Sequence, residues 1–235
     1  MTELLYHIDS YVKEFTAQVV GHVPEQNGVL LDRTAFYPGG GGQPNDAGQL
    51  LVGDKVYPVP SVARGNIHVI TRELPAVGTT VTGQLDWDRR YKLMRTHTAM
   101  HILCGVVFRD YGASVTGGNM EPLSGRMDFE FERMQKELVN EIETAINAEV
   151  AASRDIRVKI LPRDEAFKIP DLIRTKINLL PEGIPEVRTV EIVGLDLQAD
   201  GGTHVANTRE VGRIRVTDYK SKGGINKRIY IEMDN

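Results

Sequence analysis

Short runs of strand-forming residues, largely apolar, fill the first third of the chain. β-branched and aromatic residues gather in these runs, and Gly, Pro, Asn and Asp separate them; the runs cover residues 16–23, 28–37, 48–59, 66–74 and 79–86. Short strands punctuated at roughly eight to twelve residues are typical of a small antiparallel barrel or sandwich. We therefore expect a β-barrel domain over residues 1–86.

The spacing of apolar residues changes at residue 87. After the charged run DWDRRYK they follow a helical period, at Leu93, Met94, Met100, Ile102, Leu103, Val106 and Val107. Asp86 or Asp88 suits the N-cap and Gly112 suits the stop, so we predict a helix over residues 87–111. Because charge and period change together here, we place a domain boundary before residue 87.

The rest of the chain alternates strand and helix patterns. Residues 134–154 predict a long amphipathic helix with apolar residues at four-residue intervals, namely Leu138, Ile142, Ile146 and Val150. We predict strands at residues 126–132, 155–162 and 187–197, a partly helical segment at 163–173 and a closing β-hairpin at 213–233. Residues 87–235 therefore form a second domain of the α+β class, an α/β sandwich.

Composition narrows the possible functions. The charged content is 26% and no apolar run approaches the ~20 residues of a membrane span, so we expect a soluble globular protein without a membrane partner. The start, MTELLYHIDSYVKEF, lacks the basic and apolar regions of a secretion signal, and Cys104 has no cysteine to pair with, so we expect the cytoplasm. A net charge of −4 argues against a protein that coats nucleic acid, and no DNA partner is expected.

Two pairs of potential metal ligands stand about a hundred residues apart. His97 and His101 lie four residues apart on the predicted helix, so both imidazoles can reach one ion. Thr98 occupies the position that the Glu of a metalloprotease motif H-E-x-x-H would take, which argues against a peptidase of that type. Taken alone, the pair is also compatible with two ordinary core or surface histidines.

The second pair, Asp200 and His204, follows a predicted apolar strand. Gly201 and Gly202 lie between the two and allow a tight turn that can aim both side chains at one point. An ordinary Asp-Gly-Gly turn is the alternative. Together, the two pairs would complete a four-ligand tetrahedral set.

A glycine-rich stretch, FYPGGGGQP, follows one of the predicted strands. It lacks the Lys-Ser or Lys-Thr of a phosphate-binding loop, so nucleotide hydrolysis has little support. A sharply bent barrel loop is one interpretation. A loop that lets backbone approach a substrate is the other.

Three motifs in this order carry a resemblance to a known family. DRTAFYPGGGGQPNDAG, RTHTAMHILCGV and QADGGTHVANTREVGRIRV resemble the alanyl-tRNA editing proteins of the AlaX family, in its medium-sized class, which are similar to the editing domain of alanyl-tRNA synthetase. The resemblance implies a translation-protein type β-barrel followed by the domain common to threonyl- and alanyl-tRNA synthetases.

The resemblance also implies one zinc ion per chain. His97, His101 and His204 match the family's ligands, but Asp200 stands where the family has cysteine. An aspartate is a harder ligand than a thiolate, so it should hold zinc less selectively and leave it the stronger Lewis acid, or it could fail to bind the ion. Cys104, three residues after His101, is a fallback sulfur ligand, or a small core residue.

In the glycine-rich motif, the resemblance implies substrate contacts. Gly40, Gly41 and Gly42 would leave room for the terminal adenosine of tRNA, and Gln43 would bond near the ester. The hydroxyl of Thr34 would sense that of serine; the alternative is an ordinary strand residue.

The implied activity is an aminoacyl-tRNA deacylase that removes serine, or glycine, from mischarged alanine tRNA. No Ser-His-Asp or Cys-His arrangement presents itself, so we expect no covalent intermediate. A metal-dependent hydrolase of another small ester or amide, and a tRNA-binding module with structural zinc, are the alternatives.

Two basic clusters offer contacts to tRNA phosphates. The first comprises Arg89, Arg90, Lys92 and Arg95. The second lies in the predicted hairpin and comprises Arg213, Arg215, Lys220, Lys222, Lys227 and Arg228. Each is equally compatible with a solvated charged surface.

Overall fold

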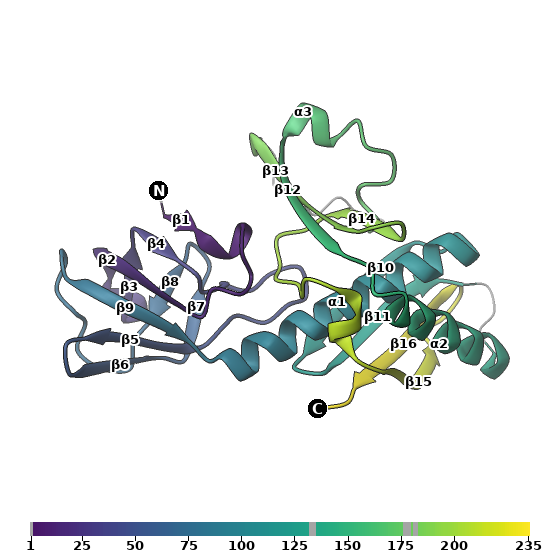
Figure 1. Ribbon diagram of the computed structural model, residues 1–235, viewed down its shortest axis with the longest axis horizontal. Helices are drawn as coiled ribbons and strands as arrows, with labels where there is room; N and C mark the ends of the chain where they lie inside the picture. Colours follow the sequence, from purple (N-terminus) through teal and green to yellow (C-terminus); the bar gives the residue numbers. More distant parts are fainter. Residues whose placement is uncertain (1, 132–134, 176–179, 181–182) are drawn as a thin grey trace. The chain divides into compact units, whose positions relative to one another are not determined.

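The computed structural model describes residues 2–131, 135–175, 180 and 183–235. The chain divides into two compact units, Met1–Lys92 and Leu93–Asn235. The long helix α1 (Trp87–Tyr111) begins in the first unit and continues into the second (Figure 1). The domain boundary expected before residue 87 stays a prediction. Within the described ranges, no helix has both the length and the apolar character that a membrane span needs.

The first unit is β-rich, as its sequence pattern predicts. Its main sheet has seven antiparallel strands in the order β6-β5-β9-β2-β3-β8-β7. Its strands are β2 (Glu14–Val23), β3 (Gly28–Leu31), β5 (Gly48–Val52), β6 (Lys55–Val59), β7 (Ser61–Ala63), β8 (Ile67–Val69) and β9 (Thr80–Leu85). A separate parallel pair joins β1 (Glu3–Leu4) to β4 (Arg33–Thr34), and short 3-10 helices cover Leu5–His7 and Pro24–Gln26.

Strand β2 shows how alternation produces this sheet. Phe15, Ala17 and Val19 are buried while the residues between them are exposed. Because successive side chains of a strand point to opposite faces, this two-residue period directs one face into the core. That core includes Phe36 and Leu50, both without exposed surface.

The ends of helix α1 follow from local signals, and both are confirmed. Asp86 caps the first turn, where its Oδ1 accepts the backbone N–H of Arg89 at 3.1 Å. Gly112 adopts a φ of +63° after the last turn, and its N–H donates to the carbonyl of Phe108 at 2.9 Å.

The second unit contains a four-stranded antiparallel sheet in the order β10-β11-β16-β15. Its strands are β10 (Val115–Glu121), β11 (Ser124–Glu130), β15 (Ile214–Ser221) and β16 (Asn226–Met233). The predicted hairpin is confirmed as β15 and β16, whereas β10 was not predicted from its polar, Gly-Gly-containing sequence. Helix α1 packs closely on this sheet, since a Cβ at Gly125 would lie 3.0 Å from the sulfur of Met100.

Besides α1, the described residues of this unit form two shorter α-helices and one 3-10 helix. Helix α2 (Lys136–Ala151) confirms the predicted amphipathic helix, with Ile142 and Ile146 buried. Met134, the first residue of the expected range, lies outside the described residues. Helix α3 (Arg163–Ala166) confirms a partly helical segment, and a 3-10 helix covers Thr208–Val211.

A three-stranded antiparallel sheet has the order β12-β13-β14, with strands β12 (Ile156–Pro162), β13 (Glu186–Ile192) and β14 (Asp196–Ala199). The single strand predicted over residues 187–197 is wrong. The chain reverses at Gly194, whose φ of +76° suits a tight turn. The turn then approaches α1 at Gly105, where a Cβ would lie 3.0 Å from the Cβ of Asp196. This contact sets Asp196 against the helix that carries His97 and His101.

Candidate metal centre

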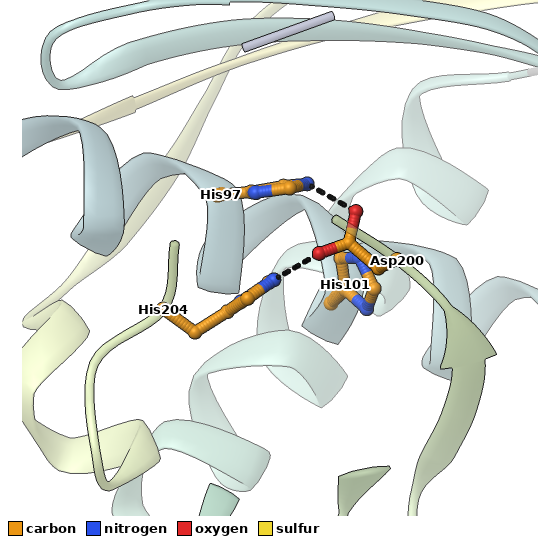
Figure 2. Close-up of side chains that lie close together, drawn as sticks. All are labelled: His97, His101, Asp200 and His204. Atoms are coloured by element: carbon orange, nitrogen blue, oxygen red, sulfur yellow. Dashed lines mark hydrogen bonds and ion pairs between the residues drawn. The ribbon is translucent and has the colours of Figure 1, made fainter. Parts of the chain in front are cut away.

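Four potential ligands from two parts of the second unit meet at one point. His97 and His101 project from neighbouring turns of α1, while Asp200 and His204 lie in the loop that follows β14 (Figure 2). One ligand atom from each residue lies within 4.8 Å of the others. The structure therefore brings together the four residues that the sequence selects.

The aspartate lies between two of the imidazoles. Its Oδ2 is 3.0 Å from Nε2 of His204, and its Oδ1 is 3.6 Å from Nε2 of His97 (Figure 2). The rings of His97 and His204 are stacked with centroids 4.3 Å apart, and His101 meets both edge-on. The three ring centroids thus lie between 4.3 and 5.1 Å from one another.

The donor atoms and spacing suit a small transition-metal ion. In a tetrahedral zinc site with bonds of about 2.0–2.1 Å, neighbouring ligand atoms are separated by about 3.4 Å. The two Asp200 distances bracket this value, and all four ligand atoms lie within 4.8 Å of one another, so small shifts of the side chains would enclose an ion. Three imidazole nitrogens and one carboxylate oxygen are a donor set that zinc accepts.

Protonation in the cluster also favours metal binding. Burial lowers the pKa of His97 well below its usual value and that of His204 to about 4, so both rings are neutral near pH 7. Burial alone would raise the pKa of Asp200, but His97 and a hydrogen bond from His204 outweigh it and hold that pKa well below its usual value. Neutral imidazoles and a charged carboxylate are the forms that bind metals.

Asp200 is held by its own surroundings. The backbone N–H of Gly202 donates to its Oδ2 at 2.8 Å, as in an Asx-type turn. The guanidinium of Arg188, on β13, donates to the carbonyl of Asp200 at 2.9 Å. Arg188 is a contact that the sequence did not reveal, because it depends on the pairing of β13 with its neighbours.

Two further neighbours of the histidines also escaped sequence analysis. Asp196 lies 3.1 Å from Nδ1 of His101, and the hydroxyl of Thr98 lies 3.1 Å from Nδ1 of His204. Burial lowers the pKa of His101, but the hydrogen bond and charge of Asp196 outweigh it, and the net pKa is raised. A carboxylate within a predicted strand carries no local signal for such a contact.

Cys104 lies outside the cluster of ligands found among the described residues. It is buried, and Nε2 of Gln198 lies 3.3 Å from its sulfur. Burial raises the pKa of its thiol, so the thiolate that metals prefer is disfavoured. Its surroundings fit the alternative interpretation of a small core residue.

The glycine-rich segment forms a tight turn in the first unit. Gly40 and Gln43 exchange both backbone hydrogen bonds, at 3.0 and 2.9 Å. The four glycines at positions 39–42 all have positive φ values, from +57° to +144°, which L-amino acids with side chains rarely adopt. Gln43 is buried. The glycines are therefore required by the turn itself.

Thr34 lies in the same unit, buried against His68. Its hydroxyl is 2.8 Å from Nε2 of His68, whose Nδ1 lies 3.4 Å from the carbonyl of Val29. Burial lowers the pKa of His68 to about 4, so the ring is neutral near pH 7. Its hydrogen is on Nδ1, because the carbonyl of Val29 can only accept a hydrogen bond. Thr34 therefore donates to His68, and its oxygen accepts the N–H of Phe36 at 3.1 Å.

The arginines near the start of α1 bind the protein itself. Arg90 has no exposed surface, forms an ion pair with Asp46, and donates to the carbonyls of Ser10 and Ala35. Because this guanidinium is buried and bonded within the protein, it cannot contact a phosphate. The tRNA contact expected at Arg90 is therefore replaced by a structural role. Arg89 donates to the carbonyl of Asn45 at 3.1 Å.

The remaining predicted basic residues differ in exposure. Lys92 is an ion-pair partner of Asp88 at 2.7 Å, and Arg95 donates to the carbonyl of Val211 at 3.0 Å. Lys220 and Lys222 are exposed at the end of β15 and in the turn that follows. The tRNA contacts expected of these four residues and of Arg89 stay predictions.

Comparison with known proteins identifies the family. A model described as the threonyl and alanyl tRNA synthetase second additional domain matches residues 187–230, which include Asp200 and His204. A model of class II (A) tRNA synthetases matches residues 6–89, which include the glycine-rich segment. The chain is 42% identical to the alanyl-tRNA editing protein AlaX-M of Saccharolobus solfataricus, over 98% of both chains. The chain belongs to the AlaX-M family.

Other relatives fit this assignment. The AlaX-M protein of Methanosarcina acetivorans is 36% identical over 99% of both chains. The alanine–tRNA ligase of Ignicoccus hospitalis is 40% identical over 92% of this chain but only 24% of the ligase. This chain thus matches a segment about a quarter of the ligase's length, and the resemblance carried by the three motifs is confirmed.

Proposed function

We propose that this AlaX-M protein hydrolyses the ester that joins a wrong amino acid to alanine tRNA, acting in trans on the charged tRNA in the cytoplasm. Serine is the proposed amino acid and glycine the second. The observation that carries the proposal is the near full-length similarity to AlaX-M proteins, in a chain whose three histidines and one aspartate converge. The reaction is an ester hydrolysis without a covalent enzyme intermediate.

The proposed substrates follow from a limit on recognition. A synthetase pocket for alanine gains only about 1–3 kcal/mol of discrimination from a missing methyl group, and it rejects an added hydroxyl poorly. Serine and glycine are the amino acids that differ from alanine in these two ways. A separate hydrolase removes such errors after charging.

We propose zinc as the cofactor, held by His97, His101, His204 and Asp200. Burial and neutral imidazoles support this assignment. When bound, the ion supplies a positive charge that can activate water, polarise the ester carbonyl or position the substrate's amino group. The chain's own residues orient that charge and exclude bulk water from it.

For the first unit we propose a translation-protein type barrel that contributes substrate contacts, with residues 1–86 and 87–235 as the two domains. The glycine turn has positive φ values and carries no side chains, which supports close approach of a ligand to the backbone of Gly40, Gly41 and Gly42. Gln43 would bond near the ester. Thr34 would accept a hydrogen bond from the serine hydroxyl, since its own hydrogen is already donated to His68.

A deacylation assay tests the proposal. We expect release of serine from seryl-tRNA(Ala), with loss of activity on chelation and in His97→Ala. Hydrolysis of a different small ester with intact seryl-tRNA(Ala) would favour a hydrolase of another class. Tight tRNA binding without any hydrolysis would favour a binding module with structural zinc. Full activity in metal-free protein would reject the mechanism.

A further inference from the structure

Two of the three histidines in the cluster are bonded through the ring nitrogen that faces away from it. Nδ1 of His101 lies 3.1 Å from Oδ2 of Asp196, and Nδ1 of His204 lies 3.1 Å from the hydroxyl oxygen of Thr98. In each case Nε2 is the nitrogen that faces the cluster (Figure 2). For His204, this nitrogen lies 3.0 Å from Asp200.

Asp196 is placed to hold His101 in one state. It is buried, and Nε2 of Gln198 donates to its Oδ2 at 2.7 Å. The guanidinium of Arg174 lies 3.5 Å from its other oxygen. A charged carboxylate only accepts hydrogen bonds, so the neutral ring of His101, the form that binds a metal, carries its hydrogen on Nδ1 and presents a lone pair on Nε2.

Thr98 makes an equivalent contact to the second ring. It follows His97 on α1, and its side chain is fully buried. Its oxygen accepts the backbone N–H of Val205 at 3.3 Å, which aligns the hydroxyl with the loop that carries His204. When Nε2 of His204 faces an ion, the ring hydrogen is on Nδ1 and donates to this oxygen.

We propose that Asp196 and Thr98 are positioning residues of the metal centre, which fix the tautomers and orientations of His101 and His204 so that both Nε2 atoms point at the ion. This inference rests on the metal centre of the proposed function. Hydrogen bonding to the outer nitrogen of a ligating histidine also makes the ring a stronger ligand. Removal of either partner should therefore weaken metal binding without touching a ligand.

The first test replaces the carboxylate. In Asp196→Asn the amide can turn its NH₂ toward His101 and favour the wrong tautomer, so we expect the dissociation constant for Zn²⁺ to rise about 10–100-fold, as for other residues behind metal ligands. Competition with a chromophoric chelator at fixed pH measures it. Asp218→Asn is the matched control, because Asp218 is exposed on β15 and is not a member of the cluster. It should bind Zn²⁺ as the unaltered chain does.

The second test separates the hydroxyl from side-chain volume. Thr98→Val keeps the shape but removes the acceptor, and we expect weaker Zn²⁺ binding by about tenfold or more. Thr98→Ser keeps the acceptor and should restore most of the affinity. Thr144→Val, at an exposed position of α2, is the matched control and should have no effect.

Two measurements exclude a merely structural effect. The thermal midpoint of the metal-free protein should change far less than the metal affinity in Thr98→Val and Asp196→Asn. With Co²⁺ as a probe, the visible spectrum of Asp196→Asn at saturating metal should shift, because His101 then donates from a ring without its carboxylate partner. A spectrum identical to that of the unaltered chain, with equal affinity, would overturn the inference.

The outcomes distinguish this inference from the proposed function. An unaltered chain that binds Zn²⁺, with Asp196→Asn and Thr98→Val binding equally well, rejects the positioning roles alone. An unaltered chain that binds no metal rejects the proposed metal centre and this inference with it. Absence of deacylase activity in a chain that binds Zn²⁺ rejects the proposed reaction and leaves the positioning roles supported if the affinities fall as expected.

Discussion

Asp200 offers a carboxylate oxygen to the proposed metal centre, at the position where the resemblance to the AlaX family implies a cysteine sulfur. It lies between His97 and His204, and its negative charge offsets that of a bound cation. We expect Asp200→Ala to lower zinc retention, since the three remaining imidazole ligands bring no negative charge to offset that of the cation. Elemental analysis after dialysis measures zinc per chain, with Asp218→Ala as an exposed control. Unchanged zinc content in Asp200→Ala would show that the carboxylate does not bind the ion.

His68 gives the first unit a pH-dependent stability. Burial lowers its pKa from the ordinary value of 6.5 to about 4 in the folded chain, so the unfolded chain takes up a proton first as pH falls. The stability that neutral His68 contributes is fully present above pH 6.5 and is lost as pH falls from 6.5 to 4. A shift of this size corresponds to about 3 kcal/mol.

Comparison of the unaltered chain with His68→Gln measures this effect. We expect the difference in their free energies of unfolding to shrink by about 3 kcal/mol between pH 7.5 and pH 4, because glutamine does not titrate. Urea unfolding at several pH values gives the difference. The histidines of the metal cluster titrate in both proteins, so their contribution cancels when metal-free samples are compared. A difference independent of pH would contradict the assigned pKa.

At the scale of elements, Arg90 links the start of α1 to the base of the glycine-rich segment. Its guanidinium binds Asp46, which also accepts the backbone N–H of Tyr37, and it reaches the carbonyl of Ala35. Arg90→Ala would leave Asp46 buried without its cation, a change that typically costs about 3–5 kcal/mol. Chemical denaturation should show this loss.

Arg33→Ala provides the comparison. Arg33 pairs with Glu3 at 3.2 Å, but both side chains are about half exposed, so the pair contributes at most about 1 kcal/mol. Equal losses in the two variants would mean that burial of Arg90 adds nothing to the stability of the first unit.

Elements with local signals could be predicted from sequence. The cap at Asp86 and the stop at Gly112 fix the ends of α1 from neighbouring residues alone. Alternation likewise predicted β15 and β16, and a run rich in β-branched residues predicted β2. The division of residues 187–197 into β13 and β14 could not be foreseen, because a single glycine in an apolar run gives no reliable sign of a reversal.

The candidate site divides in the same way. The four-residue spacings selected His97 with His101 and Asp200 with His204, and only the resemblance joined the pairs. Asp196 was missed because its contact with His101 depends on the turn at Gly194 and on close packing at Gly105. The run of basic residues before His97 suggested a tRNA contact at Arg90. Nothing in the sequence indicated that Arg90 is buried against Asp46, which lies 44 residues away in sequence.

At the scale of the whole molecule, the proposed function requires a chain with net charge −4 to bind a polyanion, the tRNA. Local cations have to supply the attraction, and the exposed Lys220 and Lys222 of the β15–β16 hairpin are the clearest candidates. Lys220 pairs with Asp218 at 2.9 Å, and both side chains are about half exposed. Such a pair is weak, so exchanging the carboxylate for a phosphate costs little.

Salt dependence of tRNA binding tests this surface. Each phosphate contact releases counterions, so loss of one lysine contact lowers the slope of log affinity against log salt by about 1. We expect the double variant Lys220→Ala, Lys222→Ala to bind alanine tRNA more weakly at low salt, with a slope smaller by up to about 2. Because these lysines would bind substrate and transition state alike, KM should rise while kcat is kept.

Two controls accompany this test. Zinc content should not change in the hairpin variant. The double variant Lys55→Ala, Lys136→Ala, which removes two exposed lysines elsewhere, should leave the slope intact. Equal slopes in the two double variants would make the hairpin an ordinary solvated surface and place the tRNA contacts on other cations.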